Sequence, residues 1–488
     1  MKRDAWEPVA PVDRISPDPK RWLGLRPEWW VLIALGTGSM MGTMNSTIVS
    51  TILPVIRDSF GADLSSIEWV LMAYLLTVSV FLLTFGRLGD IWGHKRVYNA
   101  GLAVFVLSSG LCSLSPTEAF LIGFRCLQAI GGAMLIANSQ AILTRSFPPE
   151  QRGQLLGLLY TIASLGLLVG PSLGGYLSYA FGWRSVFYVN VFIGAVAIGM
   201  SLRLLPNPGP SEHREPFDIL GAVTMGVGLG ALLLAISKGQ ELGWTSIFTL
   251  SSIAVSVIFL ALFVRTEATV THPMLDMSLF RSRGFSFAIS STFITYVCIF
   301  SGLFLAPFYL MQGRHFSPSL SGQLYSIQPL GMLVTAPLGG YLSDRINPRL
   351  LSTLGAVCIA AGLFALHGLD AESGTGAILF SMAVLGLGNG LFVGPNANII
   401  MGGAPPERQG VASGIVATAR NLGMVFGVAV TGAILAGQMA QRTASQAGDQ
   451  ASFIGAFQDT LFIMTFVGLI GAAAAMVRQP ARAGAIAH

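Results

Sequence analysis

Charged side chains are scarce in this 488-residue sequence, where Asp, Glu, Lys and Arg together make up 10% of the residues. A soluble domain usually carries about 25%, so water is excluded as the solvent for most of the surface. Cysteine is scarce too, and the four cysteines lie in or beside apolar runs, without the spacing of a disulfide framework: Cys112, Cys126, Cys298 and Cys358. We interpret them as small apolar packing residues.

The motifs of common enzymes and of ATP-driven pumps are also missing. No phosphate-binding loop of the form G-x-x-x-x-G-K-S/T occurs, so direct coupling to ATP is excluded. No paired nucleophile and base and no metal-ligand cluster is present, so an enzyme is disfavoured and we expect no metal or cofactor. The net charge of +5 is not gathered into a basic stripe with interleaved aromatics, which argues against a nucleic-acid partner.

Long apolar runs dominate what the sequence does contain. Apolar residues make up 53% of the chain, and its 58 glycines suit membrane helices, which approach closely through small residues. A bilayer-crossing helix needs about 20 mostly apolar residues. Fourteen runs qualify: 29–53, 66–86, 96–115, 120–144, 154–178, 183–205, 217–237, 246–264, 285–311, 321–343, 350–367, 376–401, 410–435 and 455–477. The pair near 217–264 is short and closely spaced, and without it the count would be twelve.

The basic residues indicate how these runs are oriented. With both termini in the cytosol, the inside segments hold 21 Lys and Arg residues and the outside loops hold 5, while Arg125 and Arg420 lie within runs. Cytosolic loops of membrane proteins carry such an excess. One missed helix would invert every later loop, so the bias supports both the count of fourteen and the orientation. We therefore predict a multi-pass protein of the cell membrane, with the bacterial inner membrane as the expected location.

Two motifs recur in the same order, which indicates an internal repeat. The segment from Gly86 to Arg96 has a degenerate copy that begins at Gly340, 254 residues later, and Pro-Pro-Glu at 148–150 recurs 257 residues later at 405–407. Two homologous six-helix halves explain this spacing, and paired halves around a midplane site are typical of secondary transporters. The predicted organisation is a cytosolic tail (1–28), a first half (29–205), a linker with an inserted helix pair (206–284), a second half (285–477) and a short tail (478–488).

The repeated motif and three others resemble those of the major facilitator superfamily and, within it, the fourteen-helix drug:proton antiporters. Residues 86–96 match the loop pattern G-x-L-x-D-x-x-G-x-K/R-K/R at every defined position. Residues 125–133 resemble the helix-4 motif and residues 166–175 the helix-5 antiporter motif, while Trp244 and the run 273–280 are similar to loops that flank the extra helix pair. The resemblance covers nearly the whole chain. It implies an all-α major facilitator fold and multidrug export by alternating access.

The resemblance assigns a gating role to the repeated loop. Its residues here are Gly86, Asp90, Gly93, Lys95 and Arg96, with Asp344 and Arg345 in the second copy. A carboxylate such as Asp90 in a Gly-bounded turn can cap a helix N-terminus and pair with nearby Arg or Lys. Breaking that contact would accompany opening of the cytosolic gate. A purely structural turn is the alternative.

The helix-5 motif combines close packing with a kink. Gly166, Gly170 and Gly174 recur every four residues and Gly175 follows, so one face of this helix is smooth enough for close approach of another helix. Pro171 lacks a backbone donor and is expected to kink the helix. Helix packing alone would explain the glycines, so their antiporter meaning rests on the resemblance.

Polar residues within apolar runs are the candidates for coupling or for lining a cavity. A charge near mid-bilayer costs about 2.5–3.5 kcal/mol on insertion scales, so Arg125 should face a wet cavity or a partner, unless backbone carbonyls hold it as a structural arginine. Gln128 and Ser139 share its helix face, and Arg420 raises the same question in a later helix. The amides Gln328, Asn389 and Asn396 either line a cavity or bond between helices.

One position departs from the antiporter pattern. The fourteen-helix antiporters usually carry an Asp in helix 1, where this sequence has Asn45, and no carboxylate in the middle of a run replaces it. An amide cannot titrate, so we expect transport to depend weakly on a proton gradient, unless Asp90, Glu68 or a histidine such as His315 or His367 carries the proton. Basic residues without acids also favour neutral or anionic substrates over dications.

The sequence thus predicts a secondary transporter that exports amphipathic small molecules. Protons are a possible second substrate, the lipid bilayer is its surroundings, and a monomer is expected. A lipid or glycolipid translocator and an uncoupled facilitator stay open as alternatives within the class. A membrane-embedded sensor or enzyme is the remote alternative.

Overall fold

A computed structural model describes residues 27–147, 149–205, 219–270, 277–343, 345–403, 409–444 and 449–477. The predicted cytosolic tail before residue 27, the tail after residue 477 and the motif residue Asp344 therefore lie outside the described residues. Every regular element within the described ranges is helical. This matches the fold class expected from the apolar runs.

The first half of the chain forms six long helices and one short one. Their bounds are α1 Pro27–Phe60, α2 Leu64–Ile67, α3 Trp69–Trp92, α4 His94–Ser113, α5 Glu118–Ser146, α6 Pro149–Phe181 and α7 Ser185–Leu204. The helices α8 (Ile219–Leu242) and α9 (Ile247–Thr269) then correspond to the predicted inserted pair. Thr117 and Ser246 are side-chain N-caps for α5 and α9, so two of these starts are set by local sequence.

The second half repeats this order of long helices. The elements are η1 Met277–Arg281, α10 Arg283–Phe308, η2 Tyr309–Gly313, α11 Pro318–Tyr325, α12 Ile327–Ser343, α13 Pro348–His367, α14 Thr375–Gly403, α15 Gln409–Ala444 and α16 Asp449–Met476. The predicted run 321–343 is interrupted at Ser326, which separates α11 from α12.

Eleven helices of the described residues are long and apolar enough to cross a membrane. Each of the predicted runs coincides with a helix, but α1, α4 and α12 are not among the eleven. The sequences of α1 and α4 contain many hydroxyl and amide residues, and the break at Ser326 shortens α12. The count of fourteen spans therefore stays a prediction.

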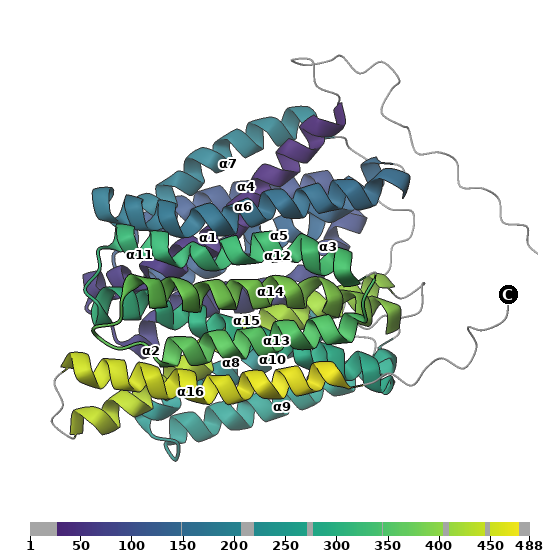
Figure 1. Ribbon diagram of the computed structural model, residues 1–488. Coiled ribbons are helices and arrows are strands. Elements are labelled where there is room, and N and C mark those ends of the chain that lie inside the picture. Colours follow the sequence, from purple (N-terminus) through teal and green to yellow (C-terminus); the bar gives the residue numbers. More distant parts are fainter. Residues whose placement is uncertain are drawn as a thin grey trace, which may run out of the picture.

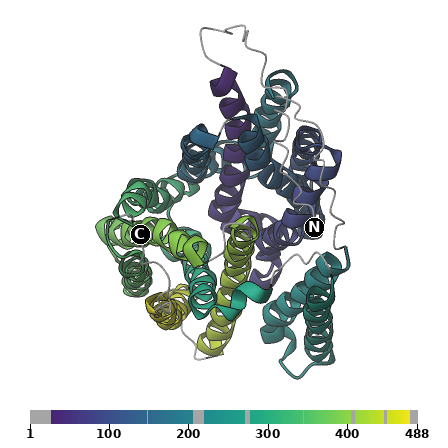
Figure 2. The same ribbon diagram turned by 90° about the vertical axis from the view of Figure 1, so that its right-hand side faces the viewer.

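The helices lie roughly parallel, with α4, α6 and α7 of the first half on one side of the bundle and α13 and α16 of the second half on the other (Figure 1). Seen end-on in Figure 2, the first half (purple to blue) and the second half (green to yellow) face each other, and the teal pair α8–α9 lies at one side. The pair is attached through α8, which packs against both α3 and α15. We call the end of the bundle that holds α2 and α11 the outer end, following the predicted orientation, and the opposite end the inner end.

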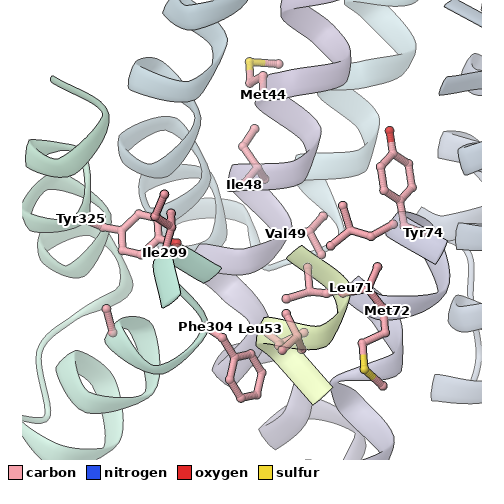
Figure 3. Packing of buried hydrophobic residues seen from close by; sticks show 14 of the residues in the cluster. Met44, Ile48, Val49, Leu53, Leu71, Met72, Tyr74, Ile299, Phe304 and Tyr325 are labelled. Carbon is pink, nitrogen blue, oxygen red and sulfur yellow. The ribbon is translucent and has the colours of Figure 1, made fainter. Parts of the chain in front are cut away.

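One apolar cluster spans both halves. Figure 3 shows part of it, where side chains from α1, α3, α10 and α11 meet, among them Ile48, Leu71, Phe304 and Tyr325. Each of these four side chains is at most 5% exposed. The two halves are therefore joined by buried apolar surface as well as by polar contacts.

Candidate functional site

Two helices from opposite halves touch backbone to backbone near the outer end. A Cβ atom on Gly175 of α6 would collide with the carbonyl oxygen of Pro318, and one on Gly322 of α11 would collide with the carbonyl oxygen of Pro171. Only glycine allows this approach. Of the helix-5 motif, Gly166, Gly170 and Gly174 instead pack against α1 within the first half, so a single glycine of that motif, Gly175, faces the other half.

Hydrogen bonds reinforce this outer contact. Ser50 of α1 lies 3.3 Å from the hydroxyl oxygen of Tyr325, which donates to the carbonyl oxygen of Leu303 at 2.8 Å. Closer to the surface, Arg57 donates to the side-chain oxygen of Gln312 at 3.1 Å. These bonds hold the halves together on the outer side.

A buried amide network lies in the outer half of the first bundle. The side-chain oxygen of Asn45 accepts hydrogen bonds from Asn190 at 3.0 Å and from Gln128 at 3.5 Å, and Gln128 also donates to Ser109 at 2.6 Å. All four side chains are fully buried and come from α1, α7, α5 and α4. Asn45 therefore connects helices in this conformation, at the position where the antiporters usually have an acid.

Arg125 belongs to the same network and is fully buried. Its guanidinium donates to the side-chain oxygen of Gln128 at 2.6 Å and to the carbonyl oxygen of Val70 at 3.1 Å, and it stacks 4.1 Å from the centre of the Tyr74 ring. The titratable side chains that act on it electrostatically are Tyr74, Cys112 and Cys126, so no carboxylate of the described residues neutralises it. In this conformation Arg125 bonds a backbone carbonyl, the arrangement expected of a structural arginine.

The other predicted polar residues lie apart from this network. Ser139 is 4% exposed, and its hydroxyl donates to the carbonyl oxygen of Ile136 within α5. In the second half, Asn396 donates to Thr292 at 2.7 Å, so it bonds between α14 and α10. Asn389 contacts the sulfur of Met332 at 3.3 Å, and Gln328 is 3% exposed. For Asn389 and Asn396 the geometry in this conformation is that of bonds between helices.

Arg420 is placed differently, because it lies where the two halves face each other. It belongs to α15 and interacts electrostatically with Tyr296 of α10 and with Tyr160 of α6, which is in the opposite half. Tyr160 is 52% exposed, Arg420 is half-buried, and the guanidinium Nε has no hydrogen-bond partner among the described residues. The three side chains lie at a similar depth, about three turns from the inner ends of their helices.

At the inner end, the repeated loop is shorter than the sequence suggested. Asp90 lies within the last turn of α3, and Gly93, with φ 96°, occupies the N-cap position of α4. The predicted helix-capping role of Asp90 is thus wrong, since Gly93 holds that position and its backbone favours glycine. Asp90 pairs with Nε2 of His94 at 3.3 Å, and Nδ1 of His94 lies 2.8 Å from the side-chain oxygen of Asn138 on α5. This chain links α3, α4 and α5.

The basic residues of the loop contact other groups. Lys95 donates to the carbonyl oxygen of Leu205 at 2.5 Å, at the C-terminus of α7, and burial lowers its pKa. A cation there also interacts favourably with the helix dipole. Arg96 is exposed, and Arg345 of the second copy lies 4.5 Å from the centre of the Tyr341 ring. A Cβ atom added at Gly86 would have one neighbouring atom within 4 Å, the Cβ of Ala137 at 3.9 Å.

Asp90→Asn should leave expression and folding unchanged and lower transport about tenfold, because it removes the charge that attracts His94 but keeps the side-chain shape. Initial transport rates in proteoliposomes, normalised to inserted protein, measure the effect. Glu372→Gln, in an exposed loop at the outer end, is the matched control and should transport normally. Normal rates for Asp90→Asn would show that the turn is only structural.

Sequence reasoning missed several residues that the structure brings together. Asn190 and Tyr74 complete the network around Arg125, and Ser237 forms a hydrogen bond with the carboxyl group of Glu68. Asn190 is the one amide within the apolar run 183–205, a signal that the sequence did offer. Ser237 offered none, because its role depends on how α8 packs against α3.

The comparisons with known proteins agree with this architecture. The family model of the Major Facilitator Superfamily matches residues 35–220 and 218–428. The chain belongs to this superfamily. It is 33% identical to the riboflavin transporter RibZ of Clostridioides difficile over 408 residues, which are 83% of this chain and 88% of RibZ. It is 32% identical to the multidrug resistance protein Stp of Mycobacterium tuberculosis over 412 residues, 84% of this chain and 76% of Stp.

Solved structures show the same fold. A bacterial homologue of the human lysosomal transporter Spinster, in an inward-facing and unoccupied conformation, superposes with a TM-score of 0.66. The match covers 92% of this chain and 96% of that protein at 14% identity, so it bears on the fold alone. The relatives are transporters, so the expectations of a membrane transporter and of a protein that is not an enzyme are confirmed.

Proposed function

We propose that this superfamily transporter exports amphipathic small molecules, neutral or anionic rather than cationic, by alternating access. The observation that carries the substrate class is Arg420, a half-buried guanidinium that lies near Tyr296 of its own half and Tyr160 of the opposite half. An oriented guanidinium attracts anions and repels cations. Tyr160 and Tyr296 beside it offer hydroxyl groups and aromatic faces that suit flat amphipathic molecules.

The distribution of acids supports the same substrate class. The carboxylates of the described helices lie in the first or last turn of a helix or beside it, apart from Asp459, which pairs with Arg442 at 2.5 Å near the outer end. No carboxylate of the described residues therefore faces Arg420 from mid-helix. A cationic substrate within the membrane would need such an acid to compensate its charge.

The names of the relatives support drug-like compounds as the substrate class. Stp carries a multidrug resistance name, and RibZ is named for riboflavin, a flat molecule without a net positive charge. Both are about one-third identical to this chain over most of its length. Substrate choice lies in particular site residues rather than in the fold, so these names guide the choice of probes.

Flux measurements in proteoliposomes test the proposal. Riboflavin serves as the neutral probe, fluorescein as the anion and ethidium as the cation, at fixed membrane potential and with the pH gradient varied. We expect saturable flux of riboflavin or fluorescein with weak dependence on the gradient, and little flux of ethidium. Arg420→Ala should lower fluorescein flux about tenfold and leave riboflavin flux closer to normal. Gradient-driven ethidium flux that exceeds both others would refute the proposed substrate class.

The proposed membrane topology has fourteen spans with both termini in the cytosol. Loop 243–246 between α8 and α9 distinguishes this topology from the twelve-helix alternative, because only fourteen spans place the loop outside. A cysteine introduced at Trp244, which is 47% exposed, should react with a membrane-impermeant maleimide added to intact cells. The four native cysteines are first replaced by alanine. Labelling only after the cells are permeabilised would contradict the fourteen-span topology.

A further inference from the structure

A carboxyl group is buried at the outer end, where three helices from different parts of the chain meet. Glu68 lies between α2 and α3 and is 1% exposed. Its Oε1 forms a hydrogen bond with Ser237 of α8, and its Oε2 lies against Gly432 of α15, where a Cβ atom would collide with it. Glu68 thus touches the inserted pair and the second half at once, and α2 marks the place in Figure 1.

The hydrogen bonds around Ser237 favour a protonated acid. The Ser237 hydroxyl accepts from the indole nitrogen of Trp69 at 3.2 Å and can donate to the carbonyl oxygen of Ser65 at 3.1 Å. If Glu68 is protonated, it donates to Ser237, and Ser237 still donates to Ser65. If Glu68 is ionised, the single hydroxyl proton must turn to the carboxylate, and Ser65 loses it.

The second carboxyl oxygen points to the same conclusion. Glu68 Oε2 is buried without a hydrogen-bond partner among the described residues. Burying an ionised carboxylate with one donor is far less favourable than burying the neutral acid. Packing of Glu68 against Gly432 therefore requires the proton.

Nearby charged groups do not neutralise the carboxylate in this state. Lys238 acts on Glu68 electrostatically, but its ammonium donates to Ser65 at 3.0 Å, Ser66 at 3.2 Å and Glu241 at 2.7 Å. The hydrogen bonds from Lys238 and Ser65 hold the pKa of Glu241 below its usual value, so Glu241 stays charged near neutral pH. Other charged groups on elements that pack here are Asp63 before α2, Arg57 and Asp58 at the end of α1, Asp90 at the inner end of α3, Glu118 and Arg125 on α5, and Arg420 and Arg442 on α15.

We propose that Glu68 is the proton-binding site of the outer gate: its neutral acid closes the gate against Gly432, and its ionisation opens the gate. The inference rests on the proposed alternating-access cycle. When the halves separate at the outer end, water reaches the carboxyl group and Lys238 can pair with it. A state that buries the neutral acid binds protons more tightly, so acidification of the outer medium favours the closed gate.

The site also explains how protons can matter without a mid-span acid. Glu68 would take its proton from the outer medium and return it there, because it lies at the outer end of α3. Outer pH would then regulate the gate, while no proton crosses the membrane through this residue. Transport would then respond to the outer pH, but the pH gradient would not drive it through this residue.

Distances between spin labels across the outer gate test the site without any transport substrate. Cysteines at Leu114 and Glu372, in outer loops of opposite halves, carry the labels in a background without native cysteines, in lipid nanodiscs from pH 5.5 to 8.5. In the otherwise unmodified protein, the short-distance population should fall at least threefold as pH rises. Glu68→Gln mimics the neutral acid and should show the short distance at every pH.

Three further variants make the outcome decisive. Glu241→Gln, which alters the neighbouring acid, should keep the pH response. Ser237→Ala removes the acceptor for the acid and should shift the response to lower pH, and Gly432→Ala should favour the long distance at every pH.

A pH-independent gate in the unmodified protein, or an unchanged response in Glu68→Gln, would overturn the inference. Because no substrate is used, that failure would leave the proposed function standing, while absence of flux with an intact pH response would refute the function alone.

Discussion

Gly175→Val should hold the two halves apart at the outer end and reduce transport by about ten- to a hundredfold. The Cβ of any residue at this position would collide with the carbonyl oxygen of Pro318, and both partners are backbone in packed helices. Overpacking of this kind costs about 1–3 kcal/mol, which shifts a two-state gate by roughly 5- to 150-fold. The arrangement in which the outer side is closed would become rare, and the cycle would stall with the outer side open.

A matched variant on the same helix separates this effect from general damage to α6. At Gly157 no neighbouring atom lies within 4 Å of the position that a Cβ atom would occupy, so Gly157→Val should transport normally. The gate itself is followed by a cysteine at Ser326, which hydrogen-bonds across the contact to Ser172 at 2.8 Å. Its labelling by an external impermeant maleimide should become faster in Gly175→Val. If Gly175→Val is labelled as slowly as the unmodified protein and transports normally, the contact at Gly175 does not control how α6 and α11 separate.

Hydrophobic patterning predicted the helices well, because each bilayer-crossing segment must bond its own backbone. The positions of the helix ends were predicted less accurately. The run predicted to end at residue 86 continues to Trp92, which places Asp90 in a helix rather than in a loop. Ser326 interrupts another run, and no apolar pattern signals such a break. Polar residues and glycines at helix ends are compatible with either a helix or a loop, so tertiary contacts decide which of the two they form.

The candidate site was predicted in its composition but only partly in its arrangement. The sequence identified Asn45, Arg125 and Gln128 as unusual, and the structure places them in one network. Nothing in the sequence indicated that Arg125 would be fully buried within the first half, while Arg420 would lie near Tyr160 of the opposite half. Helical periodicity tells which residues share a face, but not which neighbour that face meets. The burial of Glu68 was unpredictable for the same reason, since α8 and α15 create it.

Arg125→Leu should leave the protein as stable as before, or more stable, and reduce transport about a hundredfold. A buried charge without a carboxylate partner is unfavourable, and on insertion scales an arginine at mid-bilayer costs about 2.5–3.5 kcal/mol. Replacing such a group by an apolar side chain of similar volume is often neutral or stabilising. If stability is retained without it, an arginine at the centre of a five-helix network is expected to act in another conformation of the cycle.

Two measurements on the same preparation check this expectation. Thermal unfolding of purified Arg125→Leu should show a midpoint equal to or above that of the unmodified protein, while the flux of riboflavin or fluorescein is nearly lost. Arg125→Lys keeps the charge but cannot reproduce the planar contacts with Gln128 and the Tyr74 ring, so it should recover part of the flux. A midpoint lowered by several degrees would make Arg125 structural, and normal flux in Arg125→Leu would remove it from the mechanism. The combination of retained stability and lost flux can arise only if the arginine contributes to transport itself.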